Sequence, residues 1–344
     1  MLNHFSTVNI VGFSIAGILT SLALQKHTNI NIYEQHKKNE HNPFCSGVLS
    51  INAVNYIKKY FFNPMKAKEQ YIFGANIHLG NKLLQIYKKQ PVAIAFNRRE
   101  FDLLGREHVD AHIMYGKRLN IADVLKLKKP IIGTDGLNSV VARAYKFPKI
   151  KKFVYAFYTY SKGKENQYVE LFLNKNFPGF FGWIIPHGNY NEYGFGVVDR
   201  KYIKQGIKFF KLNNNVKWRG SAIPIRIRSK LSEKGVFLVG DSAGTVKSST
   251  GGGIYYTAQS VNLLKRAILE NKDFDKLMKP IKKEILMHSL IQSMFELFSP
   301  LNYIFIDSIL KLIQIDKILE KHGNMDNPSE IINSIFFNNN NIFH

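Results

Sequence analysis

The sequence contains almost no cysteine. Cys45 is the only one among 344 residues, so no internal disulfide can form and no zinc site can be built from cysteines. This favours a reducing, cytoplasmic setting. No uninterrupted apolar run reaches the length of about 18 residues that a membrane-spanning helix needs. Hydrophobic residues make up 45% of the chain, and its length allows one or two domains with a sizeable core.

Acidic residues are also scarce. There are 25 Asp and Glu against 48 Lys and Arg, which gives a formal net charge of +23. An anionic membrane surface, nucleic acid or a lysine-rich solvated surface would each account for this charge. Zinc fingers, RNA-binding aromatic signatures and Arg-rich arms are absent from the sequence, which disfavours nucleic acid. We expect a cytoplasmic protein that associates peripherally with anionic membranes and holds no metal.

The apolar segment 8–24 has some features of a signal peptide but lacks the basic residues that precede one. It contains Gly12, Ser14 and Gly17, and its pattern predicts a strand, a turn and a helix. Buried strands of the parallel type are expected at 7–12, 29–34, 130–134 and 236–240, and helices at 17–25, 53–62, 97–108 and 253–270. Alternating strands are expected within 71–95, 152–173 and 182–198.

The first turn has the pattern of a dinucleotide-binding site. Gly12-Phe-Ser-Ile-Ala-Gly17 is a G-x-S-x-x-G variant in which Gly12 allows the tight turn and Gly17 lets the helix pack close to the sheet. The helix N-terminus next to Ala16 can then bind a pyrophosphate. Ser14 replaces the usual glycine, so its side chain must point away or contribute its hydroxyl. Glu34, 22 residues after Gly12, is a candidate acceptor for ribose hydroxyls. The alternative is an ordinary strand-to-helix turn.

Two internal motifs add candidate cofactor contacts. Arg98, in Arg98-Arg-Glu-Phe-Asp102, is suited to bind phosphate or to brace the flavin end of a cofactor, or it simply begins a charged helix. Asp135, followed by Gly136, lies in Gly133-Thr-Asp-Gly-Leu-Asn-Ser139. Its carboxylate can accept hydrogen bonds from backbone amides and from a ribose, or it merely caps a turn.

The strongest signal follows the last expected strand, in Phe237-Leu-Val-Gly-Asp-Ser-Ala-Gly244 and Ser249-Thr-Gly-Gly-Gly-Ile-Tyr255. Asp241 is the candidate for a ribityl or ribose contact, with a helix cap as the alternative. Gly251, Gly252 and Gly253 let the backbone lie under a flat ring where a Cβ would clash. The helix that begins near Ile254 can stabilise negative charge on a reduced flavin. Together with the turn at Gly12, this pattern predicts one FAD site built from both ends of the chain.

In this order the motifs resemble those of the flavoprotein superfamily typified by p-hydroxybenzoate hydroxylase. Two segments resemble the geranylgeranyl reductase family within it. The segment 177–186 is similar to the Y-x-W-x-F-P signature, with Trp183 and Pro186 matching and Phe181 in place of Tyr. The segment 249–256 is similar to T-G-E-G-I-x-x-A, with Gly252 in place of the acid. Cys45-Ser-Gly-Val-Leu49 also resembles a C-G-x-x-L segment of that family.

The resemblance implies an FAD-dependent oxidoreductase that saturates C=C bonds in the geranylgeranyl chains of archaeal-type membrane lipids, with NAD(P)H or ferredoxin as the reductant. It also implies substrate contacts from Phe181, Trp183 and Pro186. The proton donor is open among Cys45, Tyr255 and Tyr256. One alternative function is an FAD-dependent monooxygenase on the same fold. Another is a basic protein that binds membranes or nucleic acid on a degenerate flavin fold.

The predicted fold class is α/β. A three-layer, Rossmann-like FAD-binding domain is expected from residues 1–60, 96–150 and 226–275. An inserted antiparallel β-sheet domain for the substrate is expected from 61–95 and 151–225. A helical region at 276–337 and a frayed tail at 338–344 complete the chain.

The helical region has an apolar pattern of its own. Five residues at helical spacing are expected to share one face, and a second apolar helix face is expected around 306–313. We expect these helices to pack into the core, with membrane docking as the alternative. The five residues are Ile285, Leu286, Leu290, Met294 and Leu297.

Overall fold

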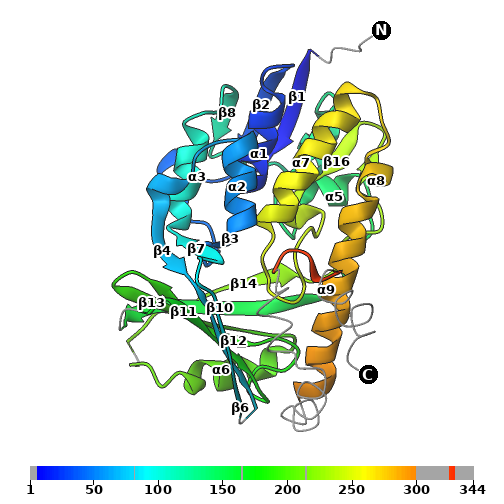
Figure 1. Ribbon diagram of the computed structural model, residues 1–344. Coiled ribbons are helices and arrows are strands. Elements are labelled where there is room, and N and C mark those ends of the chain that lie inside the picture. Colours follow the sequence, from blue (N-terminus) through cyan, green and yellow to red (C-terminus); the bar gives the residue numbers. More distant parts are fainter. Residues whose placement is uncertain (1–5, 81, 164–165, 214, 300–324, 330–344) are drawn as a thin grey trace, which may run out of the picture.

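The computed structural model describes residues 6–80, 82–163, 166–213, 215–299 and 325–329. Figure 1 shows an upper part with a sheet and several helices, a lower part dominated by a broad sheet, and α9 (Lys279–Phe298) running along one side of both. The second apolar helix expected around 306–313 and the tail at 338–344 lie outside the described residues.

The upper sheet is built around β1 (Thr7–Val11), whose short apolar run is almost fully buried. This strand pairs in parallel with β2 (Asn29–Glu34) on one side and with β9 (Ile131–Gly133) on the other. A continuous apolar run suits a central parallel strand because both of its faces are covered. Beyond these three strands lie β8 (His112–Tyr115), β16 (Val236–Leu238) and β15 (Ser232–Glu233). Only the short edge strand β15 is antiparallel to its neighbour.

Helices connect and cover this sheet. The helix α1 (Ile15–Leu24) follows β1 and packs against both α3 (Arg98–Arg106) and α7 (Ile254–Leu269). The remaining helices of the upper part are α2 (Ile51–Tyr60), α4 (Ile121–Lys126), α5 (Val140–Ala144) and α8 (Phe274–Leu277). One hydrophobic core joins the upper sheet to these helices.

The lower sheet has seven strands drawn from two distant parts of the chain. Its spatial order is β14 (Arg219–Pro224), β10 (Phe153–Lys162), β13 (Tyr190–Val197), β12 (Gly182–His187), β11 (Tyr168–Leu173), β5 (Gly74–Leu79) and β6 (Lys82–Tyr87). The pairs are antiparallel except for β5 with β11, which are parallel. One apolar cluster of this sheet includes Tyr158, Phe181 and Trp183. A separate, mainly aromatic cluster packs against α6 (Ile203–Phe209).

A small antiparallel sheet joins the two parts. It contains β3 (Val48–Ser50), β7 (Ala93–Phe96) and β4 (Lys68–Ile72), with β7 in the middle. These strands bring residues before α2 and before α3 to the junction between the two larger sheets. The arrangement agrees with the predicted α/β class and its additional sheet, while the predicted domain boundaries stay a prediction.

The helix α9 departs from the expected packing. Ile285 is fully buried, as predicted, but Leu286, Leu290, Met294 and Leu297 are exposed. The expectation that these four side chains pack into the core is therefore wrong. Helical spacing placed them on a common face but carried no information on which face of the helix turns inward.

Candidate functional site

The predicted nucleotide-binding residues meet at one edge of the upper sheet. Gly12 follows β1, Glu34 ends β2, Asp135 follows β9, and Asp241 follows β16. Because these neighbouring strands are parallel, their carboxyl ends lie at the same edge, which is where open α/β sheets bind ligands. Residues separated by more than 200 positions in the sequence therefore border one cleft.

The turn after β1 is tightly packed. Gly12 has φ +101°, and a Cβ there would lie 2.6 Å from the backbone oxygen of Thr134. A Cβ on Gly17 would lie 2.1 Å from the backbone oxygen of Gly12. Both glycines are therefore required by close backbone approach. Gly17 is not among the described residues that line the cleft, whereas Gly12, Ser14 and Ala16 are.

Ser14 does not cap α1. Its hydroxyl donates to Oδ2 of Asp102 at 3.0 Å and makes no capping hydrogen bond to the helix. The first-turn amides of α1 are thus left for another acceptor. Since a helix N-terminus favours negative charge, this end of the cleft is suited to a phosphate group.

Glu34 and Asp135 hold backbone amides at the rim of the cleft. One oxygen of Glu34 accepts from the amide of Phe13 at 2.7 Å, and the other accepts from the amide of His36 at 2.8 Å. Oδ2 of Asp135 accepts from the amide of Val140 at 2.6 Å, while its Oδ1 is buried without a hydrogen-bond partner among the described residues. Burial raises the pKa of Asp135.

Arg98 supplies a positive charge inside the cleft. It is only 7% exposed, and its Nη2 pairs with Oδ1 of Asp102 at 2.9 Å. Its Nε and Nη1 are buried and have no hydrogen-bond partner among the described residues. A buried guanidinium with two unused N–H groups in a cleft wall is suited to accept an anionic or carbonyl ligand group.

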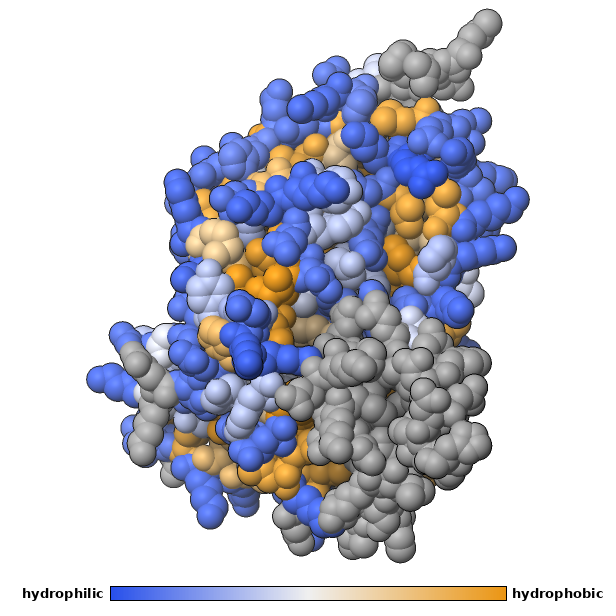
Figure 2. Space-filling view, viewed as in Figure 1, coloured by the Kyte–Doolittle hydropathy of each residue, from blue (hydrophilic) through white to orange (hydrophobic). Residues whose placement is uncertain are grey.

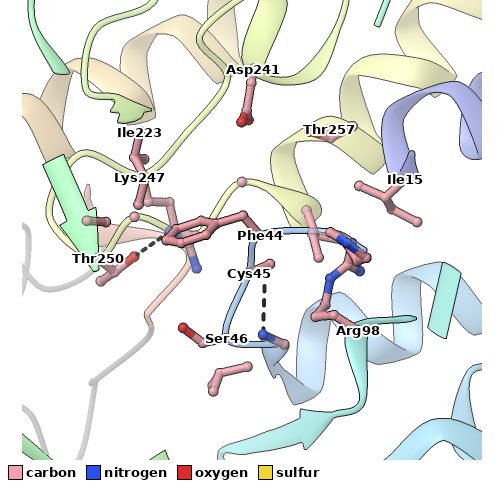
Figure 3. Close-up of a pocket in the computed structure, with 18 of the residues that line it drawn as sticks. Ile15, Phe44, Cys45, Ser46, Arg98, Ile223, Asp241, Lys247, Thr250 and Thr257 are labelled. Carbon is pink, nitrogen blue, oxygen red and sulfur yellow. Dashed lines mark hydrogen bonds between the residues drawn. The ribbon is translucent and has the colours of Figure 1, made fainter. Parts of the chain in front are cut away.

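Asp241 and the glycine cluster form the opposite wall. Figure 3 shows Asp241, Arg98 and Cys45 around the same space. Asp241 is open to the interior of the cleft but enclosed by protein, and this enclosure raises its pKa although the charge of Arg98 opposes the rise. Gly251 has φ +75°, and α7 begins after Gly253 with no capping side chain.

The cleft continues into an apolar cavity. Its volume of about 2090 Å³ exceeds the 300–1,000 Å³ that is typical of small-ligand pockets, so it has room for a cofactor and a second ligand. The lower sheet supplies most of the apolar wall, and α9 supplies Ile291, Met294 and Phe295. The apolar residues from the lower sheet and the adjoining loop include Val169, Leu171, Phe180, Phe181, Trp183 and Ile185.

Only some of the predicted substrate and catalytic residues line the cavity. Phe181, Trp183 and Cys45 line the cavity, whereas Pro186 does not. Tyr255 and Tyr256 are likewise not among the described lining residues. Tyr256 is buried, and its hydroxyl donates to the backbone oxygen of Asp326. The structure therefore brings Cys45, but neither tyrosine, to the cavity surface.

No family model matches the chain. Some known proteins are similar to it over nearly their full length, and others over only a part. An uncharacterized protein of Methanocaldococcus jannaschii is 25% identical over 379 aligned positions, covering 96% of this chain and 94% of that protein. The chloroplastic geranylgeranyl diphosphate reductase of Nicotiana tabacum is 28% identical over 167 positions, covering 43% of this chain and 35% of the reductase. The match thus spans about a third of that reductase.

The solved structures agree in fold. The crystal structure of a geranylgeranyl bacteriochlorophyll reductase-like protein from Thermoplasma acidophilum matches with a TM-score of 0.75 at 16% identity, covering 96% of both chains. The chain is similar to geranylgeranyl reductases in part of its sequence and to a geranylgeranyl reductase-like protein in its fold. This relationship confirms the predicted resemblance, the fold class and the enzyme class, an oxidoreductase of the FAD-dependent kind.

Other flavoproteins share this fold. A flavin-dependent brominase matches with a TM-score of 0.66 at 15% identity, covering 97% of this chain. A probable FAD-dependent monooxygenase from Pseudomonas aeruginosa matches with a TM-score of 0.65 at 12% identity, covering 87% of this chain. At such identities these matches show the shared fold alone.

The sequence motifs missed a buried lysine that lines the cavity. Lys247 is 6% exposed, and its Nζ pairs with Oδ1 of Asp326 at 2.9 Å. A Cβ on Gly252 would lie 3.0 Å from Cε of Lys247, so the glycine leaves room for this lysine. Lys247 belongs to no recognisable local motif, because its partner Asp326 is distant in sequence. Tyr158 also lines the cavity, and it belongs to the Tyr- and Phe-rich stretch 153–183, whose aromatic residues could line an apolar tunnel or fill a core; burial raises its pKa to about 12.

Proposed function

We propose that this chain is an FAD-dependent reductase that saturates the C=C bonds of geranylgeranyl chains in membrane lipids. The observation that carries this proposal is the continuity of one cavity. Its upper end has nucleotide-binding geometry at Gly12, Asp135 and Asp241, and its lower end is lined by apolar side chains including Phe181 and Trp183.

The residues of the upper end fit FAD. The uncapped N-terminus of α1 is suited to the pyrophosphate, and the unused N–H groups of Arg98 are suited to phosphate or a flavin carbonyl. Glu34 and Asp241 offer carboxylates for hydroxyl groups, and Gly251 to Gly253 line the cleft without side chains. FAD, when bound, supplies hydride transfer, and the protein supplies position and electrostatics.

The lower end fits a long apolar chain. An isolated alkene offers no polar group for the protein to activate, so alignment and exclusion of water must contribute strongly to the rate. Trp183 is well placed for this role because its indole Nε1 donates to Oε1 of the buried Glu192 at 2.8 Å. That bond fixes the orientation of the ring in the cavity wall. Phe181 stacks on Phe180 with ring centroids 4.2 Å apart.

Saturation of a double bond consumes a hydride and a proton, and Cys45 is our candidate for the proton donor. Its thiol lies on the cavity wall, where Sγ accepts from the amide of Gly47 at 3.4 Å. Burial raises the pKa of Cys45, which keeps the thiol protonated at neutral pH. Donation leaves a thiolate that water must protonate before the next cycle, and Arg98 lies close enough to stabilise that charge.

The reductant and the site of action complete the proposal. The sequence offers no second dinucleotide motif, so NAD(P)H would bind only transiently, and ferredoxin is the alternative donor. The net charge of +23 supports peripheral association with an anionic membrane, consistent with a role in lipid biosynthesis. Figure 2 shows many hydrophilic side chains on the upper part of the molecule, with hydrophobic patches between them. None of the described helices is long and apolar enough to cross a bilayer.

The test is an anaerobic turnover experiment. Purified protein loaded with FAD is reduced with dithionite and mixed with a geranylgeranylated lipid, and the lipid is analysed by mass spectrometry. The proposal predicts a mass gain of two hydrogens per double bond without any need for oxygen. An unchanged lipid would contradict it. Consumption of oxygen in proportion to a hydroxylated product would instead identify a monooxygenase, the alternative function on this fold.

A further inference from the structure

The buried side of α9 is apolar at Ile281 and Ile285 but polar further along the helix, at His288, Ser289 and Gln292. His288 is 3% exposed, and its Nδ1 lies 2.7 Å from Oγ of Ser249 in the loop before α7. Gln292 is fully buried, and its Nε2 donates to the backbone oxygen of Gly179 at 3.0 Å. These bonds connect α9 to both the upper and the lower part of the molecule, so its orientation about its own axis is fixed.

The opposite side of α9 is apolar and exposed. Its side chains are separated by four, four and three residues, which places them on one face over three turns. We call this set the outer α9 face. Surface helices normally turn such a stripe inward, and contiguous exposed apolar patches mark interaction sites. The outer α9 face consists of Leu286 (56% exposed), Leu290 (62%), Met294 (51%) and Leu297 (67%).

This face is continuous with the apolar end of the cavity. Met294 belongs to both, since it is half exposed and also lines the cavity beside Ile291 and Phe295. Met294 therefore joins the outer α9 face to the lining of the cavity. The strand β6 also contributes the apolar residues Leu84 and Ile86 to the cavity lining. A patch that served only for protein contact would have no need of this continuity.

We propose that the outer α9 face docks on an anionic lipid bilayer and admits a lipid-borne chain to the cavity. A bilayer offers the apolar depth that these four side chains need, and its negative surface attracts a chain of net charge +23. Lys279 and Lys283, in the first turns of α9, are exposed beside this face. A second copy of the chain is a poorer occupant because two chains of the same high charge repel each other.

The entry role of this surface rests on the proposed function, but its docking does not. Docking is therefore measured without turnover, by sedimentation with phosphatidylcholine vesicles that contain phosphatidylglycerol. The variant Leu290→Glu/Leu297→Glu adds two charges to the face and leaves the cavity-lining residues unchanged. Its matched control is Leu125→Glu, because Leu125 is 53% exposed on α4, outside the cavity. FAD content and melting temperature are recorded for each variant to confirm folding.

We expect the double variant to partition onto vesicles about tenfold less than wild type, and Leu125→Glu to stay close to wild type. High salt should also weaken the binding of the wild-type protein to the vesicles, because about 0.1 M salt screens charges that are more than roughly 10 Å apart. Equal partitioning of wild type and the double variant would overturn the proposal. So would an equal loss in both variants, which would indicate charge alone. Unchanged partitioning with a lower melting temperature or an altered oligomeric state would assign the face to residues 300–324 or to a second copy.

Discussion

Ser14 donates its hydroxyl to Oδ2 of Asp102 at 3.0 Å, which turns the side chain away from the N-terminus of α1. Nε2 of His41 also contacts that oxygen, at 2.9 Å, and Arg98 pairs with the other oxygen. Although burial by itself raises the pKa of a carboxyl, the charge of Arg98 and the bonds from His41 and Ser14 hold the pKa of Asp102 below its ordinary value. This carboxylate explains how a serine is tolerated where dinucleotide-binding turns usually have glycine.

Asp102→Asn should destabilise the protein by about 3–5 kcal/mol at neutral pH, because it leaves Arg98 buried without its counter-charge. The folded-state pKa of Asp102 lies below the unfolded value of about 3.9, so its stabilisation is present above about pH 4 and is lost as pH falls through the folded value. The difference in the free energy of unfolding between wild type and Asp102→Asn should therefore become smaller in acid. Urea unfolding at several pH values measures this, with the exposed Asp110→Asn as control. A difference in the free energy of unfolding that does not change with pH would contradict the role given to the Asp102 carboxylate.

Gly12→Ala should abolish FAD binding. The added Cβ would meet the backbone oxygen of Thr134 at 2.6 Å, and the turn that must face the pyrophosphate would shift. Gly188→Ala is the matched control, since Gly188 also has a positive φ of +65° but nothing lies within 4 Å of its Cβ position. Flavin absorbance after gel filtration should be lost only in Gly12→Ala. Retention of FAD by Gly12→Ala, or its loss from both variants, would refute the placement of the pyrophosphate.

Cys45 should react slowly with iodoacetamide at neutral pH and faster as pH rises. The thiolate is the nucleophile, and burial raises the pKa of Cys45, so little thiolate is present near pH 7. Intact mass measures the labelling, and no other cysteine interferes. Cys45→Ala should bind FAD normally but fail to saturate the lipid. Rapid labelling at neutral pH, or undiminished turnover in Cys45→Ala, would remove the thiol as the proton donor.

The pair Lys247–Asp326 joins the loop before α7 to the segment 325–329. Both side chains are buried, at 7% and 0% exposure, with 2.9 Å between Nζ and Oδ1. Lys247→Met should cost about 3–5 kcal/mol of folding stability, because a buried carboxylate would lose its partner. The double variant Lys247→Met/Asp326→Leu should recover much of that loss, and a double-mutant cycle by urea unfolding measures the coupling. Additive losses would show that the pair is not coupled.

The sequence predicted the nucleotide-binding half of the fold well, for local reasons. The strands β1, β2, β9 and β16 are short segments rich in Ile and Val or other apolar residues, and the predicted bounds 29–34 coincide with β2. The strand β8, at 112–115, was missed because it is short and partly exposed. The parallel pairing of β5 with β11 could not be predicted, because pairing between distant strands leaves no mark on the alternation within either one.

The sequence predicted those site residues that lie in a short motif at the end of a strand. Gly12, Glu34, Asp135 and Asp241 were found because each ends or follows a strand in a short motif, and parallel pairing then brings them together. Lys247 was missed because its partner Asp326 is 79 residues away, in a segment with no motif. Tyr255 and Tyr256 lie close in sequence to the glycine cluster, which favours them as site residues. In the structure, however, neither is among the described residues that line the cavity.

The most direct test is the colour of the flavin during a single anaerobic turnover. The protein should purify with, or take up, one FAD per chain, and dithionite should bleach it. Addition of a geranylgeranylated lipid under nitrogen should restore the yellow absorbance in step with saturation of the lipid. A protein that binds no flavin, or a bleached flavin that the lipid never reoxidises, would contradict the assignment of this cavity to prenyl-chain reduction.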